Sequence, residues 1–300
     1  MKKVLVINYS QSGQLNEIID NFLLPFDQAE VERLLIKPVK PIAFPWTEDV
    51  FYDTMPACVA EEAIAIEPLQ YGSDRYDLIV IGYQPWFLSP SLPITSLMQD
   101  ATFQEKMKGT PVVTIIGGRN MWLNSQESIK AYIKQAGGIL VGNIPLMDRE
   151  PNLVSVLTIF HWMLTGKKTK KWGILPMPGV SEEEIKSGHK FGTIVNRALR
   201  QGDFSGLQQK LLSLGIINIP TDIWFIEMRA KKIFRKWVSI IKKRGTTADK
   251  RKFYVNLFKY YLLIALFVVS PILLTLYFVL IAPFSQKSIQ ESKDYFYGVN

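Results

Sequence analysis

Hydroxyl, amide and glycine residues gather in one short loop near the start of the chain. The stretch Ser10-Gln11-Ser12-Gly13-Gln14-Leu15 follows an apolar run and opens a helical pattern. Two hydroxyls, a glycine that permits close backbone approach and the positive end of a helix suit a phosphate group. The loop has neither the Gly-Lys-Ser/Thr ending of a Walker A motif nor the glycine spacing of a Rossmann fingerprint. It therefore predicts an anion site, with an ordinary strand-to-helix turn as the alternative.

Two further loops carry flat side chains and small residues after apolar runs. They read Gln84-Pro85-Trp86-Phe87-Leu88-Ser89-Pro90 and Gly117-Gly118-Arg119-Asn120-Met121-Trp122. A planar ring could stack there while backbone groups bond its edge. Plain core packing explains any one of Trp86, Phe87 and Trp122 on its own. Three such loops at one sheet edge favour a flat cofactor that carries one phosphate.

Residues for nucleophilic or metal chemistry are sparse. Cys58 is the only cysteine, so the chain has no internal disulfide and no cysteine-rich metal site. Carbon–carbon condensation by thiolase-like enzymes needs a cysteine supported by histidines or asparagine, and no histidine stands near Cys58 in the sequence. We therefore predict neither a condensing activity nor a metal site.

Candidates for proton transfer are weak. His189 shares a helical face with apolar residues, which indicates a buried structural histidine. His161, in the stretch IFHWML, fits either a pocket or an interface. Tyr83 and Tyr9 are conceivable proton donors, and Arg119 could hold negative charge on a ring or a substrate. The catalytic residues are thus unknown, with Tyr83, Arg119 and His161 as the candidates.

Alternating apolar runs and helical patterns position these loops. Continuous apolar runs, typical of parallel strands covered on both faces, lie at 4–8, 31–36, 77–84, 111–118 and 138–146. Capping-box pairs, Asn124 with Glu127 and Ser181 with Glu184, predict two helix starts. We expect an α/β fold with a doubly wound, five-stranded parallel sheet, whose ligand binds outside the carboxyl ends of the strands.

Three motifs resemble those of one family. KVLVINYSQSGQLNEI resembles the phosphate loop of flavodoxin-like FMN proteins, YQPWFLSPSLP the aromatic loop of flavodoxin-fold quinone reductases, and GGRNMW their following glycine loop. The resemblance covers residues 1–200 and implies FMN as cofactor. In this chain the implied FMN contacts are Ser10, Gln11, Ser12, Gly13, Gln14, Leu15, Pro85, Trp86, Phe87, Gly117, Gly118, Arg119 and Asn120. Leu15 stands where the family often has threonine.

The whole chain looks more particularly like flavodoxin-like proteins of bacterial dialkylresorcinol and aryl-polyene pigment pathways, often labelled condensing enzymes. That resemblance implies aromatisation of a lipophilic cyclic diketone made by a ketosynthase-type partner. Converting such a dione to a resorcinol removes two electrons, and a flavin can accept them as a hydride. The alternatives are an NAD(P)H-dependent quinone reductase and a non-enzymatic electron carrier or membrane scaffold. The sequence does not decide between a monomer and a homodimer.

The C-terminal part holds one long apolar run. Residues 260–284 carry no charged side chain, and Lys259 and Lys287 bracket them. Such a run can span a bilayer core with some tilt, and Pro271 at its midpoint should kink the helix. The alternative is an apolar C-terminal helix that is buried in the interface of a soluble dimer. The sequence leaves open whether the run spans fully or re-enters.

Positive charge is concentrated just before this run. Residues 229–252 carry eleven lysines or arginines and one aspartate, while the whole chain has a net charge of +8. An apolar face and a lysine-rich face over 222–243 are typical of a helix in a membrane interface. No base-reading module accompanies the charge, which argues against nucleic acid. The resemblance implies a bacterial inner-membrane protein, and by the positive-inside rule we expect the catalytic domain to be cytoplasmic and the tail outside.

These patterns divide the chain into four segments. Long insertions beside a compact sheet are usually functional, and two are predicted, at about 38–75 and 147–180. The expected segments are a flavodoxin-like FMN domain at 1–205, a basic amphipathic region at 206–256, a transmembrane helix at 257–285 and a polar tail at 286–300.

Overall fold

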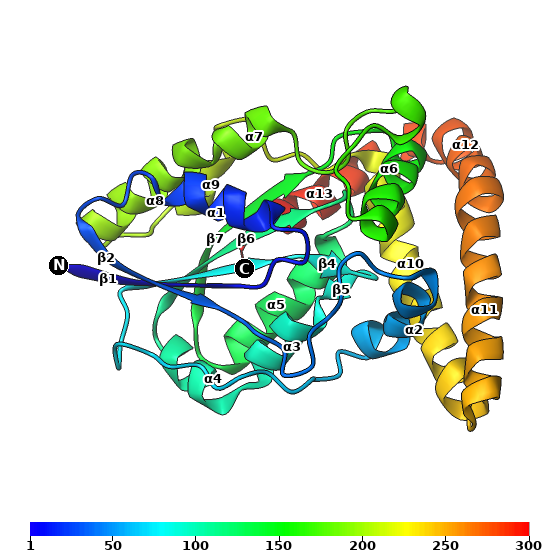
Figure 1. The fold of residues 1–300 in the computed structure, drawn as a ribbon. Helices are drawn as coiled ribbons and strands as arrows, with labels where there is room; N and C mark the ends of the chain where they lie inside the picture. Colours follow the sequence, from blue (N-terminus) through cyan, green and yellow to red (C-terminus); the bar gives the residue numbers. More distant parts are fainter. Residues whose placement is uncertain (300) are drawn as a thin grey trace.

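The computed structural model describes residues 1–299. Within them, five parallel strands form one sheet: β1 (Lys2–Asn8), β2 (Ala29–Leu35), β3 (Leu78–Tyr83), β6 (Pro111–Gly118) and β7 (Ile139–Met147). Their spatial order is β2-β1-β3-β6-β7, which is the doubly wound order of flavodoxin-like folds (Figure 1). The expected five-stranded parallel α/β sheet is confirmed, and the predicted strand bounds agree with the observed ones to within two residues.

The central strands carry continuous apolar runs because helices cover both faces of the sheet. Residues 4–7 of β1 and 78–81 of β3 are fully buried, and Val4 pairs with Leu78 in parallel register. One face is covered by α1 (Gln14–Leu23), α7 (Glu182–Lys186), α8 (Gly188–Gln201) and α9 (Leu207–Leu212). The other is covered by α3 (Leu92–Gln99), α4 (Ala101–Met107) and α5 (Leu123–Gln135).

The helix that follows the first loop has a close neighbour. α8 packs so tightly on α1 that a Cβ built on Gly192 would lie 1.9 Å from the carbonyl oxygen of Phe22. Only glycine fits this approach without a backbone shift, since overpacking a core contact is destabilising. The contact fixes α1, and with it the loop that α1 begins from.

The two predicted capping boxes have different outcomes. Ser181 is the N-cap of α7, and its Oγ accepts a hydrogen bond from the Glu184 N–H at 3.2 Å, as predicted. The prediction for Asn124 and Glu127 is wrong: α5 begins one residue before Asn124, whose side-chain amide donates to the carbonyl oxygen of Glu227. The Asn124 side chain, which the local pattern assigned to a helix cap, binds Glu227 of a helix distant in sequence instead.

The prediction of a buried His189 is also wrong. The helix that starts after Ser181 ends near Ser187, and a second helix, α8, follows it directly. His189 lies in the first turn of α8, where its side chain is exposed and its Nδ1 is 2.6 Å from the carbonyl oxygen of Lys186. The break rotates His189 away from the apolar face that α8 turns to the sheet.

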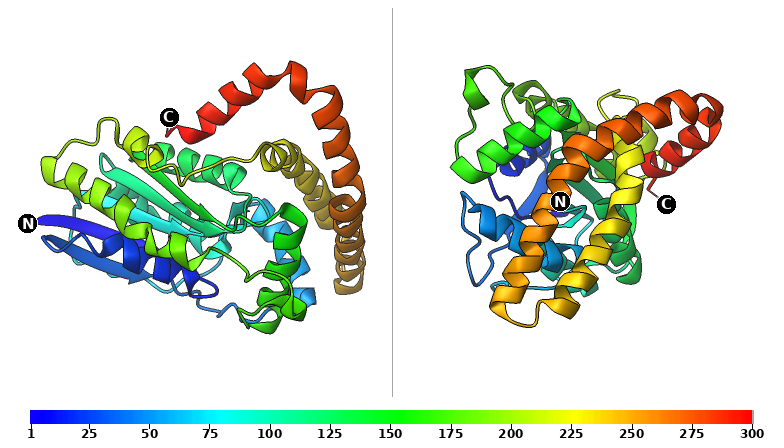
Figure 2. Two further views of the ribbon diagram at one scale, coloured as in Figure 1. Left: turned by 90° about the horizontal axis from the view of Figure 1, so that it is seen from above. Right: turned by 90° about the vertical axis from the view of Figure 1, so that its right-hand side faces the viewer.

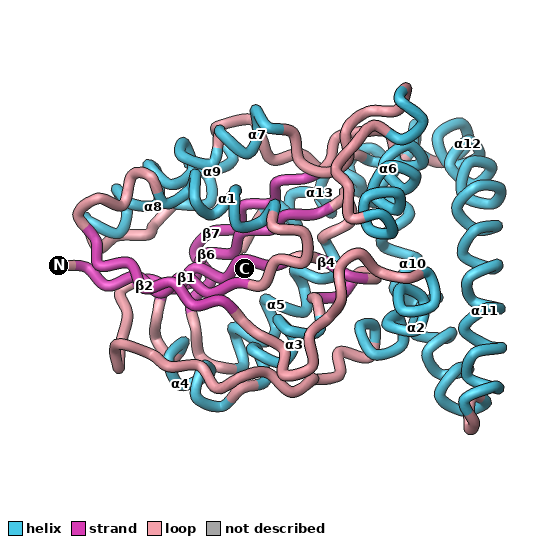
Figure 3. Tube along the Cα trace, in the orientation of Figure 1, coloured by secondary structure: helices cyan, strands magenta, loops and turns pink. Residues whose placement is uncertain are grey.

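Both insertions lie beyond the carboxyl ends of the strands. The first contains α2 (Glu48–Val59) and the second α6 (Asn152–Thr165) with a short 3-10 turn, η1 (Lys171–Gly173). A small hairpin of β4 (Pro85–Trp86) and β5 (Ser89–Pro90) follows β3. Figure 3 shows the magenta strands running toward the side where α2, α6 and α10 gather.

The C-terminal third is helical. α10 (Thr221–Arg244) and α11 (Ala248–Ile264) form an antiparallel pair, followed by the π-helical turn η2 (Ala265–Val269), α12 (Ser270–Leu280), η3 (Ala282–Phe284) and α13 (Gln286–Tyr297). Figure 2 shows α13 returning to the sheet domain. By length and composition, one helix of the described chain, Ala248–Leu280, could cross a membrane.

Candidate functional site

The first loop leaves a helix start open. Gly13 is the N-cap of α1, with φ of +88°, and a Cβ built there would meet nothing within 4 Å. Within residues 1–299, no side chain caps this helix start, and the buried Oγ of Ser10 has no hydrogen-bond partner. Unpaired buried hydroxyls are uncommon, and free amides at a helix N-terminus attract anions. The loop therefore fits a phosphate group.

Other residues of this loop have structural contacts. The Gln11 N–H donates to the Gln84 side chain at 2.8 Å, which ties the first loop to the second. The Gln14 side-chain amide exchanges two hydrogen bonds with the backbone of Val180, each 3.0 Å long. Leu15 is fully buried in the core. The Gln14 amide thus holds the second insertion, and Leu15 is part of the core while it also lines the loop end of the cavity.

The second loop is a strained hairpin. Its two central residues, Phe87 and Leu88, have φ of +48° and +63°. A two-residue hairpin with positive φ at both positions is a type I′ turn, which favours Asn-Gly, and a bulky residue there costs on the order of 1–3 kcal/mol. Such strain persists only where the surroundings hold it in place.

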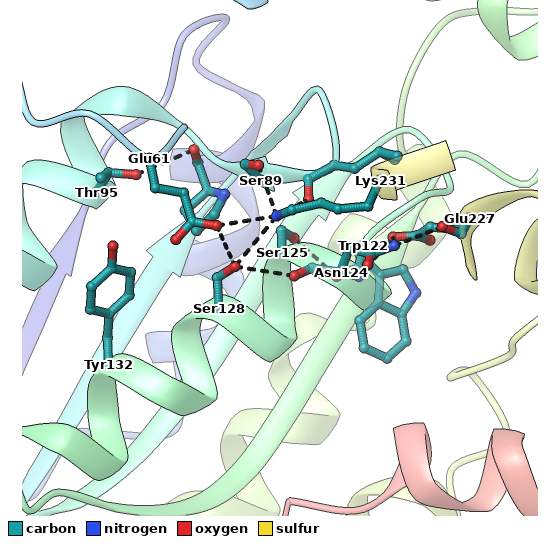
Figure 4. A network of polar contacts seen from close by, with 12 residues as sticks. Glu61, Ser89, Thr95, Trp122, Asn124, Ser125, Ser128, Tyr132, Glu227 and Lys231 are labelled. Carbon is teal, nitrogen blue, oxygen red and sulfur yellow. Dashed lines mark hydrogen bonds and ion pairs between the residues drawn. The ribbon is translucent and has the colours of Figure 1, made fainter. Parts of the chain in front are cut away.

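A buried cation holds this hairpin. The Lys231 Nζ donates to the Leu88 carbonyl oxygen at 3.0 Å and to the Ser89 Oγ at 2.9 Å, and it pairs with Glu61 at 3.1 Å. The Ser128 Oγ also binds Glu61, at 2.6 Å. Burial lowers the pKa of Lys231, and the charge of Glu61 partly offsets that effect. Figure 4 shows the ammonium group at the centre of these contacts.

The third loop carries a half-buried cation. The Arg119 guanidinium donates to the Asn152 Oδ1 at 2.6 Å, at the start of α6, and lies 3.4 Å from the sulfur of Met121. Burial lowers the pKa of Arg119 to about 10, against the opposing charges of Asp148 and Glu227. Arg119 is therefore still a cation at neutral pH.

Small residues bring the second and third loops together. A Cβ built on Gly118 would lie 3.1 Å from Pro85 Cδ, and one on Gly117 would lie 3.1 Å from Ile18. Next to them, the buried Asn120 Oδ1 has no hydrogen-bond partner in the described part of the chain. The third loop therefore offers an unsatisfied acceptor beside a narrow backbone approach.

A second buried ionisable residue of α10, Glu227, binds the backbone just after the third loop. Glu227 is fully buried, and its Oε1 accepts a hydrogen bond from the Asn124 N–H at 2.8 Å, in the first turn of α5. Burial raises the pKa of Glu227 to about 7, although Asn124 and Arg119 stabilise its charge. Glu227 and Lys231 lie one helical turn apart, so α10 is attached to the second and third loops through two buried charges (Figure 4).

All three loops open into one cavity of about 440 Å³. Its loop end is lined by Gln11, Ser12, Pro85, Trp86, Phe87, Gly117, Gly118 and Arg119. Its other walls come from α2, α6, α10, α11, η2 and α12, and most of them are apolar. The cavity therefore joins the anion-suited loop to the long apolar helix, with both insertions in its lining.

Aromatic rings of both insertions support the second loop. The Trp86 ring packs edge-on against Trp46, with centroids 4.9 Å apart. The Phe51 ring lies 4.8 Å from Phe87 and 5.2 Å from Phe160 of α6. Aromatic pairs of this geometry add to the free energy gained by burial. The insertions thus form the aromatic wall of the cavity.

The catalytic candidates are separated by the fold. Tyr83 is fully buried, its hydroxyl donates to Gln126 at 2.7 Å, and burial raises its pKa. His161 lies on α6 with its Nε2 3.3 Å from Thr169 Oγ1. Of the three candidates, Arg119 lines the cavity, whereas Tyr83 and His161 are not among its lining residues within 1–299. Trp122 is a core residue.

Sequence reasoning missed the two buried charges of α10. The predicted apolar face of 222–243 ran through Ile226 and Ile233, but Ile233 is exposed and the buried face instead includes Glu227 and Lys231. Their opposite charges at a spacing of four residues were a readable signal. It was hidden because Lys231 stands in a run of lysines that looks solvated.

Comparisons with protein-family models and with curated proteins gave no match. Among solved structures, the chain is similar to a flavoprotein in complex with FMN from Lactobacillus acidophilus, with 17% identity over 48% of this chain and 93% of that one, and a TM-score of 0.39. It is also similar to a flavodoxin from the domain Archaea, with 12% identity over 66% of this chain and 99% of that one, and a TM-score of 0.36. A flavone reductase matches with 12% identity over 66% of this chain and 63% of that one, and a TM-score of 0.35. At such values the likeness says nothing about the ligand of this chain.

Replacing Lys231 by methionine should loosen the strained hairpin. The Leu88 carbonyl, the Ser89 hydroxyl and Glu61 lose their shared cation, at a cost of about 1–3 kcal/mol. Hydrogen exchange of the amides in 84–91 should become at least about tenfold faster. Lys232→Met, at an exposed neighbouring position of the same helix, is the control. Equal protection of the hairpin in both variants would contradict the role given to Lys231.

Glu227 should make stability depend on pH. Its pKa is 4.5 ordinarily and about 7 in the folded chain, so the folded state holds the proton more tightly. The bound proton stabilises the folded state fully below pH 4.5. This stabilisation is lost as pH rises to 7, at about 1.4 kcal/mol per pH unit and roughly 3 kcal/mol in all. Glu227→Gln should therefore gain stability relative to wild type between pH 5 and 8.

Melting temperatures of the detergent-solubilised chain at several pH values measure this difference. Glu67→Gln, at an exposed position, is the control and should follow the wild-type curve. Parallel curves for wild type and Glu227→Gln would show that Glu227 does not bind a proton on folding.

Proposed function

We propose that this chain is a membrane-associated, FMN-dependent oxidoreductase that aromatises a lipophilic cyclic diketone to a dialkylresorcinol. One observation carries the proposal. A single cavity runs from a loop suited to phosphate, past two loops suited to a flat ring, to a wall made of apolar helices. A phosphate-bearing planar cofactor and a long-chain substrate are the two ligands that such a lining fits.

The residues present fit FMN. The buried Ser10 hydroxyl, the Ser12 side chain and the free amides after Gly13 would hold its phosphate. The hairpin at Trp86 and Phe87 and the glycine loop at 117–120 would hold its ring system. Bound there, FMN supplies a two-electron acceptor for a hydride.

The protein supplies charge and a dry environment. Arg119 is a half-buried cation at the loop end of the cavity, where it would orient a diketone oxygen and stabilise negative charge that develops on it. Such a charge acts more strongly away from water. The aromatic wall built by α2 and α6 excludes solvent from that end. Aromatisation of the dione would remove one hydride and one proton, and Arg119 would stabilise the enolate oxygen that remains after the proton has left.

Membrane association is part of the proposal. Exposed apolar side chains run along the helix at 248–280, and the basic segment 229–252 lies beside it. Such a surface binds anionic bilayers through apolar burial and charge together. It would place the apolar end of the cavity next to lipid, where a long-chain dione from a ketosynthase-type partner would reside.

Loss of the phosphate site should abolish cofactor binding. Gly13→Asp puts a carboxylate and a Cβ at a left-handed residue beside the helix N-terminus, so FMN affinity should fall on the order of 100-fold or more. Flavin absorbance retained after gel filtration in detergent measures the loss. Gly202→Asp is the matched control, because Gly202 is also a left-handed glycine in open space, at the end of α8.

If Gly13→Asp retains FMN as wild type does, the phosphate-loop assignment is wrong. If the wild-type chain shows no flavin bands after FMN is added, the proposed enzyme is ruled out.

Direction of electron flow can be tested in a single turnover. FMN-loaded protein mixed anaerobically with a long-chain alkylated cyclohexane-1,3-dione should lose its visible flavin absorbance as the resorcinol forms. Arg119→Met should slow that bleaching about 100-fold while the protein still binds FMN. Rapid bleaching by NADH or NADPH, with no response to the dione, would instead identify a quinone reductase.

A further inference from the structure

The long apolar helix begins against the sheet domain. At its start, the Arg251 guanidinium pairs with Asp53 of α2 at 2.7 Å, and the Lys259 ammonium pairs with Glu48 at 2.7 Å. Between these contacts, Val255 is buried in a cluster with residues of α2 and α10. The first half of the helix is therefore docked on the domain rather than projecting from it.

The chain returns to the same domain after the helix. The Trp224 Nε1 donates to Ser292 Oγ at 2.9 Å, and the Lys293 ammonium donates to Thr221 Oγ1 at 2.8 Å. The Phe296 side chain is buried in a core cluster under the sheet. Figure 2 shows this last helix lying against the domain. Both ends of the apolar helix are thus fixed to one body.

Two fixed ends restrict how the helix meets a bilayer. The 33-residue helix is about 50 Å long, and a span of the roughly 30 Å hydrocarbon core would put α13 on the side opposite the domain. That arrangement would detach α13 and expose Phe296. We infer that the helix at 248–280 lies flat in one leaflet of an anionic phospholipid bilayer, as a monotopic anchor that leaves the tail on the same side as the domain.

The exposed side chains of the helix match this placement. Leu257, Ile264, Ile272 and Val279 are between 45% and 65% exposed, so apolar surface faces outward along the full length. In the first half of the helix Phe258 is fully buried against the domain, whereas in α12 Leu273, Leu276 and Leu280 are exposed as well. Apolar surface therefore surrounds the second half of the helix, and acyl chains are an environment that fits such a surface.

Charge beside the helix selects an anionic surface. α10 exposes Lys232, Lys236 and Lys243 next to the apolar helix, and the turn into α11 adds Lys250 and Lys252. Each basic residue near an anionic leaflet strengthens binding to that surface. The flanking lysines would lie at the headgroups while the apolar face enters the acyl chains.

The inner side of the same helix lines the cavity. Leu262, Leu266 and Leu273 face it, and the π-helical turn η2 lies in this wall. A helix in the leaflet would thus separate acyl chains from the ring-binding loops by one layer of side chains. A substrate could then enter the cavity from the lipid. That route rests on the proposed function, whereas the placement of the helix does not depend on flavin.

Single-cysteine labelling tests the placement. Lys190→Cys reports the domain and Glu291→Cys the tail, and native Cys58 gives little background because it is fully buried. Bacterial spheroplasts and inverted membrane vesicles are treated with a membrane-impermeant maleimide. We expect both cysteines to react in inverted vesicles and neither in spheroplasts. Labelling of Glu291→Cys from outside would overturn the inference, and recovery of the chain in the soluble fraction would overturn it together with the membrane association.

The depth of spin labels in a bilayer gives a second test, which does not depend on how the protein is oriented in cells. Spin labels at Leu257→Cys, Ile264→Cys, Ile272→Cys and Val279→Cys are read in vesicles of phosphatidylethanolamine and phosphatidylglycerol. A flat helix places all four at similar shallow depth, about 5–10 Å below the headgroups. A depth profile with its maximum in the middle of the helix would show a span. Far-UV circular dichroism of each labelled variant verifies the fold, so this test and the flavin assays can fail independently.

Discussion

The Lys231 ammonium group is buried away from water, and the geometry of the site depends on the protein groups that bind it in place of water. Desolvation of one cation costs several kcal/mol unless partners offset it. Here they come from three segments distant in sequence: Glu61 after α2, Leu88 and Ser89 in the hairpin, and Ser128 of α5. A single charge therefore sets the spacing of the first insertion, the second loop and the helix after the third loop.

The parallel sheet brings the loops together, and the additions to it make the cavity. Strand order alone places the first, second and third loops at one edge. The aromatic wall comes from α2 and α6, and the apolar floor comes from α10 and the long helix. A minimal sheet domain would leave the second and third loops open to solvent. The insertions and the C-terminal helices convert that edge into a largely apolar cavity.

The sequence predicted what depends on neighbours along the chain. Strand 111–118 was found to the residue because a strand buried on both faces is apolar throughout. The capping pair at Asn124 failed because Glu227, more than a hundred residues away, binds the same amide. Likewise, the run of lysines hid the difference between the buried Lys231 and the solvated Lys232 beside it. The loops were thus predictable, and the contacts that hold them were not, because those contacts join distant segments.

The burial of Phe296 has a consequence for the order of biosynthesis. Its cluster includes Leu5 and Ile7 of the first strand, so residues from both ends of the sequence close one core. The apolar helix leaves the ribosome before Phe296 does. This core of the sheet domain can therefore be completed only after the whole apolar helix and most of α13 have been synthesised. A chain shortened before α13 would keep its strands but leave one side of this core open to water.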